Sequence, residues 1–396
     1  MTVETRSLTN EPPRRGRQPC VLQVLPALVT GRVERGAVDV AAALVEAGWT
    51  AVVASAGGPM VRELDRVGAH HVQLPLASKN PLVMRANVAR LEAVIRDFRV
   101  DVVHARSRAP AWSALAAANR TGRRFVTTFH GTYGTGMLGL KKSYNAVMTR
   151  GRRVIAISDF IAEHIHSVYG VPSSRIRVIP RGIDMDRFDP ARVSAERIIQ
   201  LARQWRLPED CPVIMLPGRL TRWKGQTVLI EALALLGRKD VRCLLVGSDQ
   251  GRDAYREELV SLARSRGLAD VVHVVDQCND MPAAYMLTDV VVSASTEPEA
   301  FGRVSVEAQA MGRPVVATEH GGSRETVLPD GETGWLVPPR EPAALAAAIA
   351  RVLALSATER EALAQRSIAH ARDQFPRQRM CEQTLQVYAE LLSAED

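Results

Sequence analysis

Cysteine and aromatic residues are scarce in this chain, which has five Cys and 5% Phe, Trp and Tyr among its 396 residues. So few cysteines in so long a chain exclude a disulfide-stapled scaffold. None stands in a CxxC pair or beside a His at metal-ligand spacing, so the sequence predicts no metal site and structural thiols in a reducing cytoplasm. The 46% hydrophobic content excludes a disordered chain.

Long apolar runs are absent as well. No stretch of the sequence approaches the roughly 20 apolar residues that cross a bilayer, so we expect no integral membrane segment. The segment from Met1 to Arg17 is polar and lacks the apolar centre of a secretory signal, so it predicts a flexible tail.

Positive charge is concentrated in the first half of the chain. Residues 1–190 hold 27 Lys and Arg against 15 Asp and Glu, a balance of +12, and residues 191–396 hold 24 against 28, a balance of −4. This asymmetry predicts an anionic partner for the first half: a phosphate-bearing ligand, an anionic membrane or nucleic acid. Solvated arginines without any partner are the alternative.

Alternating β-rich and helical segments indicate the fold class. In the first half we expect strands at residues 20–25, 50–54, 100–104, 125–129, 154–157 and 176–179, and in the second half at 213–216, 242–246, 271–275, 290–293 and 314–317. These runs are continuously apolar, as in parallel sheets covered on both faces. The sequence therefore predicts an α/β protein with two doubly wound, Rossmann-like domains that bind ligands at the carboxyl ends of their strands.

The predicted borders follow from this alternation. We expect a tail over 1–19, a first domain over 20–190, a linker over 191–211, a second domain over 212–375 and a final helix over 376–396 that packs back towards the first domain.

Two segments of the second half carry the most chemical information. A predicted strand ends at Ser293, a polar loop contains Glu299, and a helix is expected to start near Gly302 and contain Glu307. Two carboxylates beside a helix N-terminus fit a hydroxyl-rich ligand that carries phosphate, such as a sugar or ribose. The alternative is a capping acid and a solvated helix residue.

The second segment, PGRLTRWKGQ, follows another predicted strand. Arg219 and Lys224 flank a tight loop before a helix, which is an arrangement that suits a diphosphate. The order of a Walker A loop is absent. Two ordinary surface cations are the alternative.

The ordered set GRLTRWKG, EAFGRVSVE, GRPVVAT and GGSRETV resembles the GT-B glycosyltransferases of family 4. The resemblance runs from Cys20 to the last helix and includes TGRVERGAVDVA, Phe129-His130-Gly131 and VIPRGID. It implies retaining transfer of a sugar from a nucleotide diphosphate sugar, with no metal or other cofactor required. One departure is Arg181, where the family often has Asn; neither it nor Trp223 is assigned a role.

The resemblance also implies roles for single residues. Arg219 and Lys224 would hold the diphosphate, Glu299 the donor sugar and Glu307 the ribose, with the base near residues 275–281. His130 would face the donor sugar. The other expected donor contacts are Ala300, Phe301, Gly302 and Val304 at the helix start, and Gly31 and Gly36 in a first-domain loop that contacts the donor phosphate or the acceptor.

The acceptor is expected on the basic first half. His104, Arg106 and Arg108 end a strand there and are candidate acceptor contacts, with a solvated loop as the alternative. A predicted basic amphipathic helix from Lys141 to Arg150, preceded by Leu138 and Leu140, fits peripheral docking on anionic lipid. The sequence therefore favours a saccharide or lipid-linked acceptor of lipopolysaccharide or surface-polysaccharide synthesis, and a cytoplasmic enzyme that can lie at the inner membrane face.

Two other functions fit the sequence less well. A GT-B phosphorylase would need a cofactor lysine or a dedicated phosphate site, and the sequence shows neither. A sugar-nucleotide epimerase would need further acids in the cleft, and the order EAFGRVSVE favours transfer instead. A nucleic-acid-binding protein would need interleaved aromatic residues or a known binding module, and the sequence offers neither.

Overall fold

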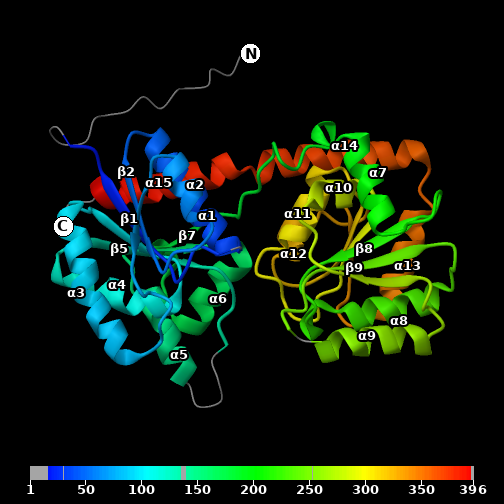
Figure 1. Ribbon diagram of the computed structural model, residues 1–396, viewed down its shortest axis with the longest axis horizontal. Coiled ribbons are helices and arrows are strands. Elements are labelled where there is room, and N and C mark those ends of the chain that lie inside the picture. The colour runs from blue at the N-terminus through cyan, green and yellow to red at the C-terminus, as the bar shows by residue number, and fades with distance from the viewer. Residues whose placement is uncertain (1–16, 30, 135–139, 252, 394–396) are drawn as a thin grey trace. The chain divides into compact units, whose positions relative to one another are not determined.

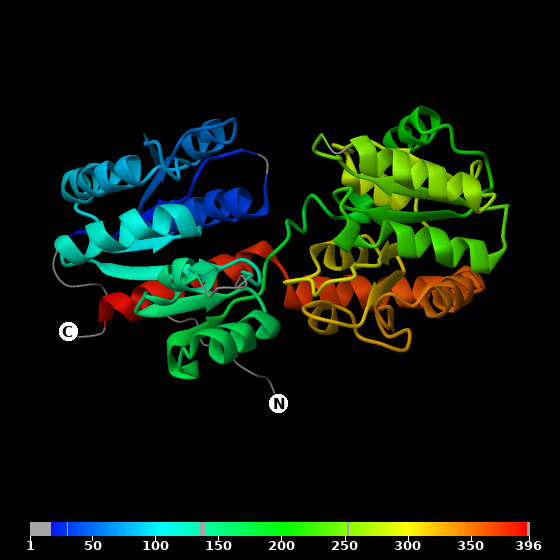
Figure 2. The same ribbon diagram turned by 90° about the horizontal axis from the view of Figure 1, so that it is seen from below.

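The structure is a computed structural model, and it describes residues 17–29, 31–134, 140–251 and 253–393. Two parallel sheets organise the chain, each with helices on both faces (Figures 1 and 2). The described residues form two compact units: those within 17–129, 133–155 and 384–393 form the first, and those within 130–132 and 156–383 form the second. The domain borders expected from the sequence stay a prediction.

The first sheet has seven strands in the order β3-β2-β1-β4-β5-β6-β7. Its strands are β1 (Cys20–Val24), β2 (Thr50–Ser55), β3 (His70–Gln73), β4 (Val102–Ala105), β5 (Arg124–Phe129), β6 (Arg153–Ala156) and β7 (Ile176–Val178). The helices that accompany it are α1 (Arg32–Glu46), α2 (Val61–Arg66), α3 (Pro81–Asp97), α4 (Arg108–Arg120), α5 (Leu140–Asn145) and α6 (Asp159–Tyr169). Strand order reverses between β1 and β4, which makes their carboxyl ends a switch point where ligands bind in such sheets.

The second sheet has six strands in the order β10-β9-β8-β11-β12-β13. Its strands are β8 (Val213–Pro217), β9 (Arg242–Val246), β10 (Val272–Val275), β11 (Val290–Ser293), β12 (Val315–Thr318) and β13 (Trp335–Val337). The remaining helices are α7 (Ala195–Gln204), α8 (Gln226–Leu236), α9 (Asp253–Ser265), α10 (Met281–Met286), α11 (Arg303–Ala310), α12 (Ser323–Thr326), α13 (Pro342–Leu353), α14 (Ala357–Gln374) and α15 (Arg377–Ser393). Here the strand order reverses between β8 and β11.

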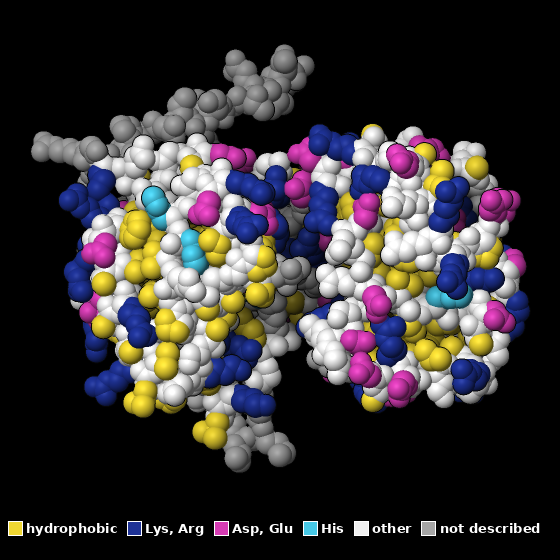
Figure 3. Space-filling view, viewed as in Figure 1, with side chains coloured by type: hydrophobic (Ala, Val, Ile, Leu, Met, Phe, Trp, Pro, Cys, Tyr) yellow, Lys and Arg dark blue, Asp and Glu magenta, His cyan; other side chains and the backbone are white. Residues whose placement is uncertain are grey.

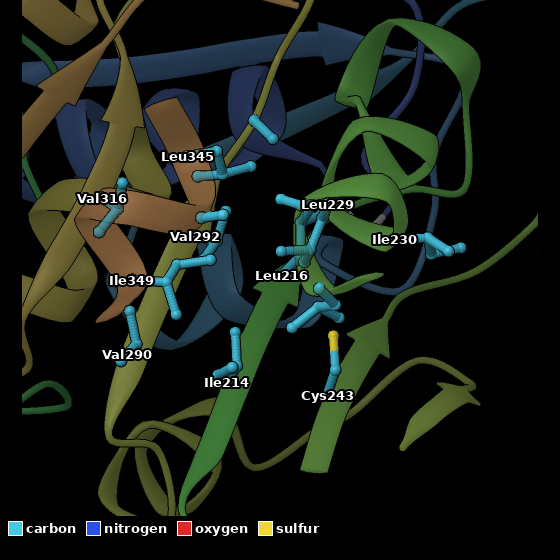
Figure 4. Close-up of a cluster of buried hydrophobic side chains, with 14 of the residues drawn as sticks. Ile214, Leu216, Leu229, Ile230, Cys243, Val290, Val292, Val316, Leu345 and Ile349 are labelled. Atoms are coloured by element: carbon cyan, nitrogen blue, oxygen red, sulfur yellow. The ribbon is translucent and has the colours of Figure 1, made fainter. Parts of the chain in front are cut away.

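Apolar side chains of the strands and of the covering helices form the core of the second sheet. Leu216 on β8, Leu229 on α8 and Val292 on β11 are at most 2% exposed, and Figure 4 shows them with Ile349 of α13 in one cluster. Burial of such side chains contributes roughly 1.5–3 kcal/mol each. This packing holds the carboxyl ends of β8 and β11 in place, and those ends carry the site described below.

The predicted parallel α/β architecture is confirmed. Strands 242–246 and 290–293 begin and end where the sequence placed them. Two strands were missed, β3 and β13, and both lie at a sheet edge. The sequence HHVQ of β3 is only partly buried, and WLV of β13 is only three residues long, so neither has the long apolar run of a central strand.

Two segments of the first half differ from expectation. Helix α1 begins at Arg32, so Gly36 lies inside the helix rather than in a loop. The predicted helix from Lys141 to Arg150 is instead α5 followed by a 3-10 turn over Ala146–Thr149. Leu138 of that prediction lies outside the described residues. At the junction Asn145 is buried and its side chain donates to the Gly134 carbonyl at 3.1 Å, an example of a polar side chain that competes with helix continuation.

Within the described ranges, no single helix is long and apolar enough to span a membrane; only α13 and α14 together meet that test, and they meet at an angle of 109°.

Candidate functional site

The switch point of the second sheet gathers the polar residues that the sequence singled out. Lys224 and Arg219 follow β8, and Glu299 follows the neighbouring strand β11. Ligands of doubly wound sheets bind in the crevice at such a point, because loops from strands of opposite order diverge there. All three residues belong to the second compact unit.

Lys224 and Glu299 form a buried ion pair. Their side chains are each 6% exposed, and the Lys224 Nζ donates to Glu299 Oε1. The same oxygen accepts from the Ser295 hydroxyl at 2.6 Å, and the Lys224 ammonium lies 4.4 Å from the centre of the Trp223 ring. The structure therefore brings together the two residues predicted to hold the diphosphate and the donor sugar, and in it they bind each other.

The backbone around this pair is closely packed. Gly225 has φ of 72°, and a Cβ at this position would lie 1.8 Å from the Ala294 carbonyl oxygen. The loop is also fixed by the Thr296 N–H, which donates to the Trp223 carbonyl at 2.7 Å. Only glycine fits this approach without displacing the β11 loop. The glycine of the WKG sequence thus holds Lys224 next to the loop that carries Glu299.

Arg219 is exposed, in contrast to Lys224. Its carbonyl accepts from the Gln226 side chain at 2.9 Å, and the next N–H, that of Leu220, donates to the Ser248 carbonyl at 3.0 Å. The main chain at Arg219 is therefore fixed while its guanidinium lies at the surface. Such a residue can meet an incoming phosphate with its forked donors.

Glu307 has partners separate from those of Glu299. It accepts from the Tyr285 hydroxyl at 2.9 Å and from Arg303 Nε at 2.6 Å, and its side chain is 12% exposed. Tyr285 is fully buried on α10, so its hydroxyl is a fixed donor.

The segment predicted to hold the base, residues 275–281, contains a fixed carboxylate near its end. Asp280 caps α10 and pairs with Arg197 at 2.6 Å. The hydrogen bond from Arg197 holds the pKa of the Asp280 carboxyl below its usual value.

Helix α11 begins beside Glu299. Gly302, its N-cap, has φ of 85°, and no side chain of the described residues caps the helix. Val304 in the first turn and the preceding Phe301 are buried, while Ala300 is half-buried. The hydroxyl of Ser305 is buried and has no hydrogen-bond partner among the described residues. A helix start with unused donors is suited to an anion.

The loop that carries Glu299 is held from two sides. The Glu299 carbonyl accepts from the Gly322 N–H at 2.8 Å, and the next carbonyl, that of Ala300, accepts from the Ser158 hydroxyl at 2.6 Å. Ser158 caps α6, whose first two N–H groups donate to Glu325 at 2.8 and 2.7 Å. Burial raises the pKa of the Glu325 carboxyl, although these hydrogen bonds act in the opposite direction. The Glu299 loop, α6 and α12 thus form one hydrogen-bonded network.

His130 directly follows β5 and is half-buried. Its Nδ1 lies 2.9 Å from an amino nitrogen of Arg181, the residue that departs from the usual family pattern. Both residues belong to the second compact unit.

The glycines predicted to contact the donor lie at the start of α1. Gly31 is the N-cap, and the Glu34 carboxylate folds over it, 2.1 Å from where a Cβ would stand. Gly36 faces Arg106, whose guanidinium lies 3.0 Å from a Cβ built at that glycine. Arg106 is 5% exposed and donates to Gln23 of β1 at 2.7 Å. The structure thus places a buried cation at the switch point between β1 and β4.

The other two acceptor candidates differ in burial. His104 is fully buried, and its ring nitrogens bond to the hydroxyls of Tyr388 at 2.6 Å and Thr128 at 2.7 Å. Burial lowers the pKa of His104 well below its usual value, with a smaller effect of Arg106. These bonds use both polar atoms of the imidazole, which favours a structural role. Arg108 is half-buried and stacks on Tyr133 with 4.4 Å to the ring centre.

Several residues of the site were not identified from the sequence, namely Ser158, Tyr285, Ser295, Arg303 and Glu325. Ser158, Tyr285 and Glu325 act through contacts with residues distant in the sequence. The four-residue spacing of Arg303 and Glu307 on one helix face is the signal that sequence reasoning can use. In the part of the chain that the structure describes, no three His, Cys, Asp or Glu side chains gather as a metal site would require.

Two family models match the chain. Glycosyltransferase Family 4 matches residues 32–187, and Glycosyl transferases group 1 matches residues 198–370. A relative from Actinosynnema mirum, named D-inositol 3-phosphate glycosyltransferase, is 33% identical over 326 residues, which are 77% of this chain and 76% of the relative. A relative of the same name from Xylanimonas cellulosilytica is 33% identical over 291 residues, 68% of this chain and 67% of the relative.

Solved structures similar to this chain include glycosyltransferases. A glycosyltransferase from Rickettsia africae superposes with a TM-score of 0.88 at 36% identity, over 96% of this chain and all of that one. HepE of Anabaena, solved in complex with UDP and glucose, has a TM-score of 0.80 at 25% identity, over 93% of this chain and 99% of its own.

Fold, site and relatives together define the protein as a glycosyltransferase enzyme of the GT-B fold. Within that class, the chain belongs to glycosyltransferase family 4, also described as the group 1 glycosyltransferases.

Proposed function

We propose that the protein transfers a hexosyl group from a UDP-sugar to a hydroxyl of an anionic acceptor, retains the anomeric configuration and requires no metal ion. The observation that carries this proposal is the buried Lys224–Glu299 pair at the switch point between β8 and β11. A cation for a diphosphate and a carboxylate for sugar hydroxyls stand there within hydrogen-bond reach of each other.

The chemistry follows from these charges. As the bond between the sugar and the diphosphate breaks, negative charge develops on the departing nucleotide, and Arg219 and Lys224 stabilise it together with the N–H groups at the start of α11. Fixed donors aimed at developing charge are usually the largest catalytic contribution. In this scheme Lys224 exchanges Glu299 for the phosphate, and Glu299 then accepts from the sugar hydroxyls.

The nucleotide is held through Glu307 in the same scheme. Its carboxylate, now bound by Tyr285 and Arg303, accepts from the ribose hydroxyls. The choice of UDP is supported by HepE, whose complexes contain UDP and glucose. The main chain near residues 275–281 would hold the base.

For the acceptor, relatives and charge point the same way. The Actinosynnema and Xylanimonas relatives are named for D-inositol 3-phosphate, a phosphorylated polyol. The first half of this chain has a balance of +12 and carries the buried Arg106 at its own switch point. An acceptor with a phosphate or another anionic group is therefore our first candidate.

The test is nucleotide release across UDP-, GDP- and ADP-sugars, with D-inositol 3-phosphate as the first acceptor and a proton NMR spectrum of the product for its anomeric configuration. We expect UDP-glucose to be used, without loss of rate in EDTA, and Lys224→Ala, Arg219→Ala and Glu307→Ala each to lower the rate. Arg222→Ala is the matched control, because Arg222 lies in the same loop but pairs with Glu258 at the surface. Equal rates in all four variants would contradict the site assignment.

A lipid-linked or lipopolysaccharide acceptor is the second candidate, and it is favoured by one surface of the first unit. Trp112 of α4 and Leu140 and Tyr144 of α5 are 40%, 73% and 37% exposed, next to Lys141 and Lys142. Figure 3 shows hydrophobic and basic side chains adjoining at the end of this unit where α5 lies. Apolar anchors flanked by cations suit a peripheral contact with anionic lipid on the cytoplasmic face.

Sedimentation with liposomes tests this second candidate. We expect binding to vesicles that contain phosphatidylglycerol at low salt, and weaker binding by Lys141→Glu/Lys142→Glu than by a control in which two lysines elsewhere, Lys79 and Lys239, are reversed. Failure of the parent to bind such vesicles would leave the soluble anionic acceptor as the proposal.

A further inference from the structure

Arg181 is held on a rigid stretch of main chain. Just before it, the Ile179 N–H donates to the Ala156 carbonyl at 2.8 Å. Just after it, the Ile183 N–H donates to the Phe375 carbonyl and the Ile183 carbonyl accepts from the Arg377 N–H, both at 2.9 Å. Hydrogen bonds on both sides fix the point from which the Arg181 side chain extends.

Its guanidinium reaches His130. The separation of the Arg181 amino nitrogen from His130 Nδ1 is 2.9 Å, a normal hydrogen-bond length. His130 is fixed as well, because it directly follows Phe129, a fully buried residue of β5. Two anchored side chains thus meet at one defined nitrogen of the imidazole.

This contact determines the proton position on the ring. A guanidinium has five N–H donors, no acceptor, and cannot lose its proton in a protein. His130 Nδ1 must therefore be the acceptor, because a proton on Nδ1 would place two N–H donors in contact with no acceptor between them. The neutral imidazole that remains carries its proton on Nε2.

We propose that Arg181 is a positioning residue which fixes His130 as the neutral Nε2–H tautomer, so that His130 serves as a hydrogen-bond donor to an oxygen of the donor sugar and not as a base at Nε2. The proposal rests on the proposed function for the identity of the ligand. It gives a role to the residue by which this chain departs from the usual family sequence.

The residue after His130 has room for a side chain. Apart from its two chain neighbours, no described residue has a heavy atom within 4 Å of a Cβ built at Gly131, the residue after His130, and the φ of this glycine is not in the left-handed region. Alanine therefore fits the fold at this position. A ligand oxygen near His130 would meet that added methyl group, so Gly131→Ala reports on occupancy by ligand without disturbing the protein.

The tautomer can be measured without turnover. In the ligand-free full chain, labelled with ¹⁵N, two-bond proton–nitrogen correlations distinguish Nε2–H from Nδ1–H, and His130→Gln assigns the signal. We expect His130 of the parent to be the Nε2–H tautomer, Arg181→Leu to show both tautomers, and Arg181→Lys, which keeps a cationic donor, to restore the parent pattern. Arg177→Leu on β7 is the control, since its guanidinium bonds to the carbonyls of Ser174 and Ile176.

Kinetics then test the link to the ligand. For Arg181→Leu we expect kcat/KM for the sugar donor to fall roughly tenfold, the size of one hydrogen bond, with partial recovery in Arg181→Lys and no change in Arg177→Leu. For Gly131→Ala we expect a higher KM and an unchanged tautomer and melting temperature.

The outcomes separate the two proposals. An Nδ1–H tautomer in the parent, or an unchanged tautomer in Arg181→Leu, overturns the role of Arg181. A changed tautomer with unchanged kinetics in both Arg181→Leu and Gly131→Ala overturns the contact with the sugar. Absence of any nucleotide release from the parent, with the expected tautomers, overturns the proposed function and leaves the assignment of the tautomer intact.

Discussion

Removing the charge of Glu299 alone should destabilise the protein more than removing both charges of its ion pair. With both side chains 6% exposed, Glu299→Gln leaves the Lys224 ammonium buried beside a neutral amide. Breaking a buried pair from one side costs about 3–5 kcal/mol, whereas replacing both partners by uncharged side chains of similar volume is close to neutral. In a domain of about 150–250 residues, 1 kcal/mol shifts Tm by roughly 2–4 °C. We therefore expect Glu299→Gln to melt roughly 6–20 °C below the parent.

The double variant Lys224→Met/Glu299→Gln is the matched control. It removes both charges and keeps side chains of similar volume, so its free energy of unfolding should lie within about 1 kcal/mol of that of the parent. Its transfer activity should be lost. Differential scanning calorimetry of the three proteins measures both shifts. If Glu299→Gln melted with the parent, or the double variant melted lower than Glu299→Gln, the pair would not have the energetics of a buried ion pair.

UDP distinguishes the role of the cation from that of the carboxylate. A ligand at 100 times its Kd stabilises a protein by about 2.7 kcal/mol. Under the proposed function, UDP draws Lys224 of the parent away from Glu299 and leaves that carboxylate buried with only part of its hydrogen bonds. We expect UDP to raise the Tm of Glu299→Gln by more than that of the parent, and the Tm of the double variant by less. Equal shifts in the three proteins would show that Lys224 does not meet the diphosphate.

Three further predictions concern the surroundings of the site. Tyr285→Phe removes the 2.9 Å hydrogen bond to Glu307, so KM for the donor should rise several-fold with a smaller change in kcat, as steady-state kinetics will show. Burial raises the pKa of Glu325 in the folded protein, so its contribution to stability is largest at low pH and is lost as pH rises through the raised value. The Tm of the parent relative to Glu325→Gln should therefore fall as the pH rises above the usual titration range of a glutamate carboxyl. Gly225 and Gly237 have φ of 72° and 68°, but only at Gly225 does a Cβ meet a carbonyl oxygen, so Gly225→Ala should lower Tm much more than Gly237→Ala, which costs about 1 kcal/mol.

The strands whose bounds the sequence predicted without error lie inside their sheets. Val290–Ser293 is a continuous apolar run at the centre of its sheet, and its bounds were predicted without error. His70–Gln73 lies at an edge, where one side of the strand faces solvent, so its polar sequence carries no run to detect. The two glycines Gly31 and Gly36 indicate a loop, but Gly36 lies within helix α1, where the absence of a side chain leaves room for Arg106.

The site was predictable where residues are near in sequence and unpredictable where they meet through the fold. Spacing and the family pattern indicated Lys224, Glu299 and Glu307, but their partners are distant in the sequence. The partner of Glu307 is Tyr285 on α10, and Lys224 and Glu299 are 75 residues apart. That Lys224 and Glu299 bind each other depends on which strands are neighbours, and strand order is a property of the whole sheet. For the same reason the contact of Arg181 with His130, 51 residues apart, had no signal in the sequence.

The mutual pairing of the charged groups determines what the site can select. A diphosphate that takes Lys224 leaves Glu299 buried without its cation, and free sugar that takes Glu299 does the same to Lys224. Leaving one buried polar group unsatisfied costs about 1–3 kcal/mol, and more for a charge. A nucleotide diphosphate sugar satisfies both groups at once, because each charged hydrogen bond is exchanged for another of similar strength. Under the proposed function, the ion pair therefore favours the intact donor over either of its hydrolysis products, and this selectivity should disappear in Glu299→Gln, where nucleotide alone meets no such penalty.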